Sequence, residues 1–106
     1  MRIAVTAQGN DVTVPVDSRF GRCQYFIIYD TDTNEFVVRA NESAAKSGAG
    51  IQSAQFMIDH NVRVVITGEV GPNARQILQS AGIAIRNTTA RTVREAVEQF
   101  LKGGYT

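Results

Sequence analysis

The sequence predicts an α/β protein, a three-layer α/β/α sandwich built on a mixed five-stranded sheet. Three observations support this class. The first third of the chain is rich in short strand patterns separated by turn residues. After residue 41, helical periodicity alternates with short apolar runs that are typical of parallel strands. The resulting order, β-β-β-α-β-α-β-α, requires right-handed crossovers and leaves three helices to cover two faces of one sheet.

The first third contains three expected strands joined by turns. These strands are expected at residues 3–7, 25–30 and 35–40. Residues 31–34 have the composition of a hairpin turn. Residues 12–16 include Pro15, which has no amide donor, so this segment is expected to be an edge strand at best, or a loop.

The remaining two thirds alternate helices and strands. Helices are expected from residue 50 to about 60, from 71 to 82 and from 93 to 101, with strands at 62–67 and 83–85. Asn61 and Gly82 suit left-handed positions after helices, and Pro72 suits the first position of one. Thr92 and Glu95 form a capping-box pattern at the last helix. Residues 102–106 are expected to be a frayed tail.

Composition favours one domain spanning residues 1–106. The chain is 43% hydrophobic and 20% charged, as is ordinary for globular proteins. Eleven basic and ten acidic residues give a net charge of +1, so no basic excess indicates nucleic acid. The single cysteine forms no internal disulfide. No signal-peptide pattern and no apolar run of membrane length occurs, so we expect a cytoplasmic protein without a membrane partner.

Three loops are expected to form one anion-accepting pocket. Ligands of open α/β sheets bind beyond the carboxyl ends of the parallel strands, where the strand order reverses. Helix starts there offer free amides and partial positive charge, glycines allow close approach, and arginines add full charges. The expected pocket residues are Arg19, Phe20, Gly21, Arg22, Cys23, Gly48, Gly50, Gly68 and Gly71. The alternative is that these glycines serve only turn geometry.

Cys23 and His60 each have a functional and a structural interpretation. A lone cysteine beside a strand is often a small buried hydrophobe, but two nearby arginines would lower its pKa and favour a metal-binding thiolate. His60 has no partner at ligand spacing and is expected to be structural or exposed to solvent. No set of nucleophile, base and orienting group is apparent, so we do not expect an enzyme.

Three segments resemble one known family. Residues 19–26 resemble the Phe-Gly-Arg-(Ala/Cys)-x-x-Phe motif of the dinitrogenase iron–molybdenum cofactor biosynthesis family, and residues 48–55 and 64–74 resemble its two other signatures. The resemblance implies a ribonuclease-H-like fold without nuclease chemistry, as in small stand-alone members. Lys46 and Ser47 stand where some members carry a histidine.

The resemblance also implies a role in handling metal–sulfur clusters. We expect a non-catalytic carrier for an iron–sulfur or iron–molybdenum-type cluster or its precursor, held as transient cargo. Its partners would be metallocluster assembly or acceptor proteins. Such a cluster is an anion that suits arginines and helix starts, and a Cys23 thiolate would suit iron. The alternative is a regulatory or scaffolding module that binds a phosphate-bearing metabolite or a partner protein through the same loops.

Overall fold

The computed structural model describes residues 1–103 and has the predicted order of elements. The strands are β1 (Arg2–Ala7), β2 (Tyr25–Asp30), β3 (Glu35–Ala40), β4 (Val62–Ile66) and β5 (Ala84–Arg86). The helices are α1 (Ala49–Asp59), α2 (Pro72–Ser80) and α3 (Val93–Leu101). The predicted mixed five-stranded α/β fold is therefore confirmed.

β1 lies at the centre of a sheet with the order β3-β2-β1-β4-β5. Ala4 of β1 stands opposite Ile28 of antiparallel β2 and opposite Val65 of parallel β4. β5 continues the parallel half, and β3 continues the antiparallel half. The chain therefore adds strands on both sides of β1, which places the reversal of strand order beside this strand.

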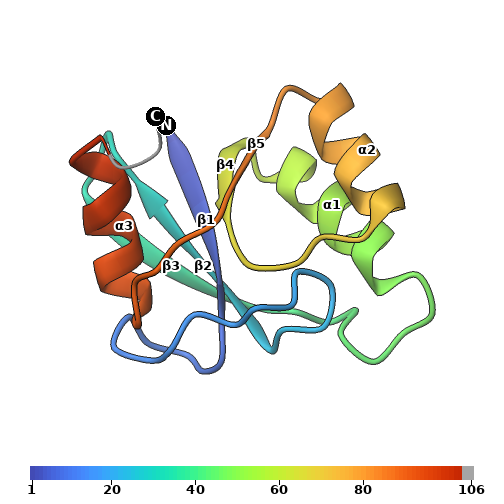
Figure 1. Cartoon of the computed structure of the whole chain (residues 1–106), viewed down its shortest axis with the longest axis horizontal. Helices are drawn as coiled ribbons and strands as arrows, with labels where there is room; N and C mark the ends of the chain where they lie inside the picture. Colours follow the sequence, from blue (N-terminus) through green and yellow to red (C-terminus); the bar gives the residue numbers. More distant parts are fainter. Residues whose placement is uncertain (104–106) are drawn as a thin grey trace.

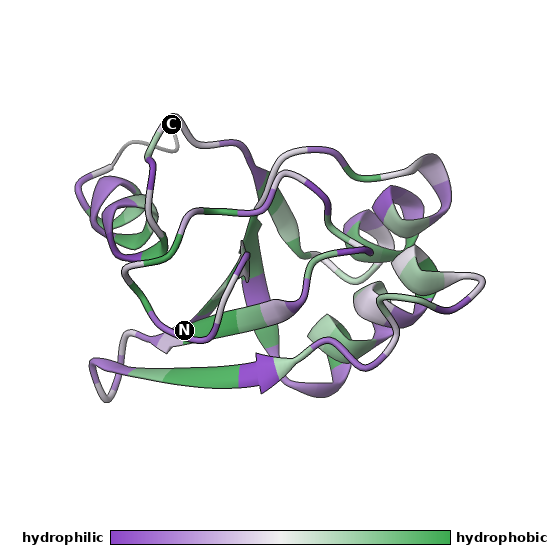
Figure 2. Cartoon of the chain, turned by 90° about the horizontal axis from the view of Figure 1, so that it is seen from below, coloured by the Kyte–Doolittle hydropathy of each residue, from purple (hydrophilic) through white to green (hydrophobic). Residues whose placement is uncertain are grey.

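The helices cover both faces of the sheet (Figure 1). α1 and α2 pack on one face and α3 on the other, which gives three layers. Side chains alternate along β1, so Ala4 faces α1 and α2, whereas Ile3 and Val5 face α3. Figure 2 shows the hydrophobic residues (green) concentrated along the strands. Alternating burial thus gives one sheet two hydrophobic cores.

The predicted helix-capping signals are present, and the bounds of β1, β4 and β5 each differ by one residue from those expected. Asn61 and Gly82 have φ values of 57° and 76°. The Thr92 hydroxyl accepts a hydrogen bond from the Glu95 amide at 3.2 Å. The Ile83 amide donates to the Leu78 carbonyl at 2.9 Å, which closes the Schellman motif of α2. Ile83 therefore belongs to the C-terminal cap of α2, and β5 begins one residue later than expected.

Residues 12–16 form a loop against the α3 face. They make only isolated bridges, from Pro15 to Thr92 and from Val16 to Ala7. The amide of Gly103 donates to the Phe100 carbonyl at 3.0 Å, so the last described turn is hydrogen-bonded. Residues 104–106 of the expected frayed tail lie outside the described residues. Among residues 1–103, no helix is long and apolar enough to cross a membrane.

Candidate functional site

One edge of the sheet gathers the three predicted loops. β1, β4 and β5 are parallel and end at this edge, and the connections that follow β4 and β5 lead into α2 and α3 there. Figure 1 shows the loop after β1, the loop after β4 and the start of α1 together along the lower edge. We call residues 17–22, 48–50 and 68–71 the loop junction.

The first contact of the loop junction joins the loops after β1 and β4. The Glu69 amide donates to the Ser18 carbonyl at 2.6 Å, and the Phe20 amide donates to the Glu69 carbonyl at 3.2 Å. A Cβ atom at Gly68 would lie 2.5 Å from the Ser18 carbonyl oxygen. Gly68 is therefore needed because the two backbones touch at this point.

The second contact joins the loop after β1 to the start of α1. A Cβ atom at Gly21 would lie 2.7 Å from the Gly50 amide nitrogen. Gly48 has a φ of 74°, and neither it nor Gly71 would place a Cβ atom within 4 Å of a neighbour. The expected glycines thus have different roles, since Gly21 and Gly68 serve loop packing whereas Gly48 and Gly71 border open space.

The starts of α1 and α2 lack side-chain caps. The residues at the N-cap positions, Gly48 and Gly71, have no side chain to cap with, and neither helix has an acidic residue in its first turn. The first amides of a helix have no partner within the helix and carry partial positive charge. These two helix starts therefore favour an anion at the loop junction.

Arg19 is paired with a buried carboxylate. Its guanidinium donates from Nε to Asp17 Oδ1 at 3.1 Å and from Nη2 to Oδ2 at 3.0 Å. Burial raises the pKa of the Asp17 carboxyl, but the hydrogen bonds and charge of Arg19 outweigh burial, and the net pKa lies below the ordinary value. Arg19 therefore already has an anionic partner.

Arg22 has no ion-pair partner within the part of the chain that the structure describes. Its Nη1 atom donates to the carbonyls of Ala44 at 2.9 Å and Lys46 at 3.1 Å, and its side chain is exposed. These hydrogen bonds hold the Arg22 guanidinium against the loop that leads into α1. Of the two predicted arginines, Arg22 thus presents a charge that no described carboxylate neutralises.

Cys23 and Phe20 lie inside the core beneath the loop junction. Cys23 is fully buried, and its Sγ atom lies 3.5 Å from the Phe20 carbonyl. Burial, with the negative charge of Asp17, raises the pKa of the Cys23 thiol to about 12. The net lowering of the Cys23 pKa that the sequence suggested does not occur, because burial outweighs the favourable interactions of the thiolate. Arg19 is paired with Asp17, and Arg22 donates to the carbonyls of Ala44 and Lys46.

A cavity of about 390 Å³ opens beside the loop junction. Its lining comes from the ends of β4 and β5 and from the loop after β1, and includes Ser18, Gly68, Asn87 and Thr88. In the side-chain orientation that points the Asn87 amide nitrogen at the backbone, Asn87 donates to the carbonyls of Thr67 at 3.0 Å and Gly68 at 3.1 Å. The lining offers hydroxyls, amides and the Glu69 carboxylate, but no thiol and no basic side chain.

Sequence reasoning missed three polar residues around the loop junction: Asp17, Asn41 and Asn87. Asn41 donates from its amide to the carbonyls of Gly21 at 3.0 Å and Cys23 at 2.8 Å, and so fixes the arginine-bearing loop. Asn41 and Asn87 directly follow β3 and β5. The sequence could have indicated Asn41 and Asn87, because polar residues that directly follow strands lie where the ends of those strands meet.

No group of three or more histidine, cysteine, aspartate or glutamate side chains is arranged to hold a metal ion within residues 1–103. His60 is partly buried and stacks on Phe56, with ring centroids 3.9 Å apart. Its Nδ1 atom lies 2.9 Å from the Phe56 carbonyl. This agrees with the structural interpretation of His60.

Several proteins are similar to this chain. The apo form of the orange protein from Desulfovibrio gigas is 41% identical, with a TM-score of 0.90 over 99% of this chain and 90% of that one. A candidate NifB protein from Thermotoga is 35% identical, with a TM-score of 0.85 over 96% and 88% of the two chains. An uncharacterized protein of Methanocaldococcus jannaschii is 24% identical over 101 residues, which cover 87% of this chain and 86% of the relative.

The family match covers every described residue. The model for the family described as "Dinitrogenase iron-molybdenum cofactor" matches residues 1–103. This range includes the loop junction and all three segments that carry the resemblance. The chain therefore belongs to the dinitrogenase iron–molybdenum cofactor family.

Proposed function

We propose that this protein is a carrier for an anionic metal–sulfur cluster or cluster precursor in metallocluster assembly, with the cargo held at the loop junction. The observation that carries the proposal is the convergence of two uncapped helix starts and the unneutralised Arg22 at one edge, in a member of this family. Amides and a guanidinium attract an anion without covalent bonds. Cargo held in this way can pass to an acceptor protein.

The role proposed for Cys23 as a metal ligand requires movement of its loop. A thiolate is the metal-binding form, and the buried Cys23 thiol is protonated at neutral pH. Ligation would expose Cys23 and break the hydrogen bonds from Asn41 to the carbonyls of Gly21 and Cys23. We therefore propose that electrostatic binding comes first and that Cys23 ligates only if this loop opens.

Anaerobic reconstitution tests the carrier function. The protein is incubated with ferrous iron and sulfide, desalted, and assayed for bound iron, bound sulfide and visible charge-transfer absorption. Wild type should retain both elements, and Arg22→Gln should bind the cargo about tenfold more weakly or worse, since a charge-assisted hydrogen bond contributes about 1.5–3 kcal/mol. A second arm repeats the assay with tetrathiomolybdate in place of iron and sulfide. The proposal is refuted if wild type retains neither iron and sulfide in the first arm nor tetrathiomolybdate in the second.

Cys23→Ser separates the two modes of binding. Unchanged retention with an unchanged spectrum assigns the cargo to the loop junction alone. Loss of the sulfur-to-metal absorption at unchanged protein stability assigns a bond to the Cys23 sulfur. The unfolding transition is the control, because the substitution introduces a hydroxyl into a fully buried position.

A second candidate function is a regulatory or scaffolding module for a phosphate-bearing metabolite or a partner protein. The hydroxyls and amides that line the cavity of about 390 Å³ favour the metabolite version, whereas the Glu69 carboxylate in the same lining opposes a bound phosphate. Titration with phosphate compounds should then shift the amide resonances of residues 48–51 and 68–74, independently of Cys23. If no compound shifts them, the metabolite version fails.

A further inference from the structure

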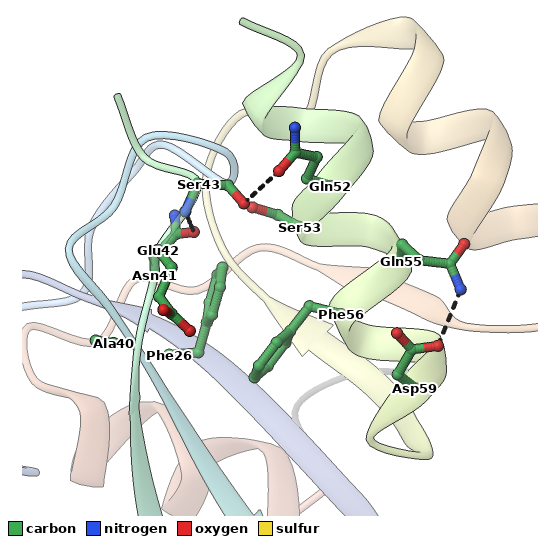
Figure 3. A pocket seen from close by; sticks show the side chains of 10 residues that line it. All are labelled: Phe26, Ala40, Asn41, Glu42, Ser43, Gln52, Ser53, Gln55, Phe56 and Asp59. Carbon is green, nitrogen blue, oxygen red and sulfur yellow. Dashed lines mark hydrogen bonds between the residues drawn. The ribbon is translucent and has the colours of Figure 1, made fainter. Parts of the chain in front are cut away.

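A second cavity, of about 330 Å³, lies between the end of β3 and α1 (Figure 3). Residues 40–43 line one side, and α1 lines the other through Gln52, Ser53, Gln55, Phe56 and Asp59. In Figure 3, the Phe26 and Phe56 rings lie between these two sides. Neither the loop junction nor the proposed cargo uses this cavity.

Ser53 contributes a hydroxyl without a partner to this cavity. Its side chain lines the cavity from α1, the residue is 1% exposed, and its Oγ atom has no hydrogen-bond partner. Figure 3 shows the hydroxyl pointing from α1 toward Ser43. A buried polar group without a partner destabilises the folded state. An occupant that hydrogen-bonds to Ser53 would remove this cost.

The neighbouring polar groups leave oxygen atoms to accept hydrogen bonds. The Asn41 amide nitrogen is used by the carbonyls of Gly21 and Cys23, and its Oδ1 accepts from the Ser43 amide at 3.2 Å. The Ser43 hydroxyl donates to Gln52 Oε1 at 2.8 Å, so the lone pairs of Ser43 Oγ remain able to accept hydrogen bonds. Together with Ser53, this end of the cavity suits a ligand that donates several hydrogen bonds.

The charge of the lining is negative, and its floor is apolar. Glu42 and Asp59 are among the ten lining residues, which include no lysine, arginine or histidine. Phe26 and Phe56 stack with ring centroids 5.1 Å apart. The carboxylates disfavour an anion, and the rings can contact an aliphatic chain. The cavity therefore fits a cationic head group on an apolar stem.

We propose that this cavity binds a primary ammonium group carried on an alkyl chain, either a lysine side chain or a free alkylamine. An ammonium group has three donors and no acceptor, which matches the oxygens of Asn41, Ser43 and Ser53. Its positive charge is complementary to Glu42 and Asp59, and its methylene stem can contact the partly buried Phe56 ring.

The test is an NMR titration of the whole chain at low ionic strength with two amines. They are n-butylammonium and Nα-acetyl-lysine methylamide, which keeps its side-chain ammonium group. Both should give saturable shifts in the amides of residues 41–43 and 52–56. n-Butanol is the probe without charge. Glu42→Gln should weaken amine binding about tenfold, and Ser53→Ala about threefold or more. Glu98→Gln, an exposed carboxylate on α3, is the matched control and should bind like wild type.

The outcomes separate the sources of the ammonium group and can overturn the proposal. Tighter binding of the lysine derivative identifies a protein side chain as the occupant, and tighter binding of n-butylammonium identifies a free amine. The proposal is overturned if neither amine gives saturable shifts, if n-butanol binds equally well, or if Glu42→Gln and Glu98→Gln have equal effects. Glu42 is exposed, so this comparison stands even if Ser53→Ala impairs folding.

Discussion

Arg19 and Arg22 stand three residues apart, yet their charges have different roles. Arg19 forms a bidentate pair with the buried Asp17 carboxylate, whereas Arg22 donates to backbone carbonyls. The Asp17 amide also donates to the Thr6 carbonyl at 2.8 Å, which holds Asp17 beside the end of β1. Arg19 thus holds the loop in place, and Arg22 is the better candidate to meet an anion.

Titration of Asp17 tests this division. The folded-state pKa of Asp17 is lowered because Arg19 outweighs burial, so its contribution to stability is present above the unfolded-state pKa of about 3.9 and is lost as pH falls through the folded-state pKa. Arg19→Met removes the side-chain hydrogen bonds and the charge but keeps the backbone amide of residue 19, which donates to Asp17 Oδ1 at 2.9 Å, so the pKa of Asp17 should rise above its value in the wild type. Carboxyl ¹³C NMR measures both pKa values. Equal values in the two proteins would show that the pair does not set the pKa.

Two glycines of the loop junction should respond differently to alanine. Gly68→Ala places a Cβ atom 2.5 Å from a backbone oxygen and should lower the free energy of unfolding by at least about 1–3 kcal/mol. Gly71→Ala meets open space at a φ of −64°, but alanine is a poorer N-cap residue than glycine, so the two effects oppose each other and the free energy of unfolding should change by less than about 1 kcal/mol. Urea denaturation gives both values. Similar losses in the two variants would contradict the assigned roles.

The thiol of Cys23 should be unreactive in the folded protein. Its pKa of about 12, against about 8.5 for a free cysteine, reduces the thiolate fraction at pH 8 about a thousandfold, and burial blocks access further. Modification by Ellman's reagent should therefore follow unfolding as urea increases. Rapid modification in buffer would instead show that the loop opens, as metal ligation by Cys23 requires.

At the scale of elements, α1 and α2 begin at glycines that cannot cap them. Ser, Asp and Asn at the N-cap are typically more favourable than glycine by a few tenths of a kcal/mol. The Gly71 backbone is extended, as a capping residue requires, and no atom would crowd a Cβ there. A serine or aspartate at this position would therefore be accommodated. The bare amides fit a site that receives an anion from outside the chain.

Matched substitutions at Gly71 separate capping from charge. Gly71→Ser and Gly71→Asp should each raise the free energy of unfolding by a few tenths of a kcal/mol, because both side chains can cap α2. Only Gly71→Asp adds a negative charge at the loop junction, so it should bind the metal–sulfur anion more weakly than Gly71→Ser. Desalting followed by metal analysis measures retention. Equal retention by the two variants would indicate that the cargo does not contact the start of α2.

Local patterns predicted the elements, but not the contacts between them. The spacing of apolar residues and the capping signals of Asn61, Gly82 and Thr92 are properties of neighbouring residues, so the sequence reveals them. The pairing of Ser18 with Glu69 joins segments 51 residues apart in sequence, and no local pattern specifies it. Gly68 was therefore assigned to ligand approach, although the structure shows that it allows two backbones to touch.

At the scale of the whole molecule, topology alone predicted where the loops meet. β1 is central in the sheet, with the meander on one side and the βαβ units on the other, and this order brings the loops to one edge. The cavity between β3 and α1 was not predicted, because it depends on how α1 packs beside the strand. Asn41 connects the two places, since it holds the loop after β1 and accepts from Ser43.

The most direct test of the proposed carrier function is to locate the cargo by NMR in protein reconstituted anaerobically with iron and sulfide. Bound cluster should shift or broaden the amides of residues 18–22, 48–51 and 68–74, and the Arg22→Gln variant should lose these changes together with its metal. Retained metal with changes confined to other parts of the chain, or no retained metal, would contradict the proposal that the loop junction carries the cluster.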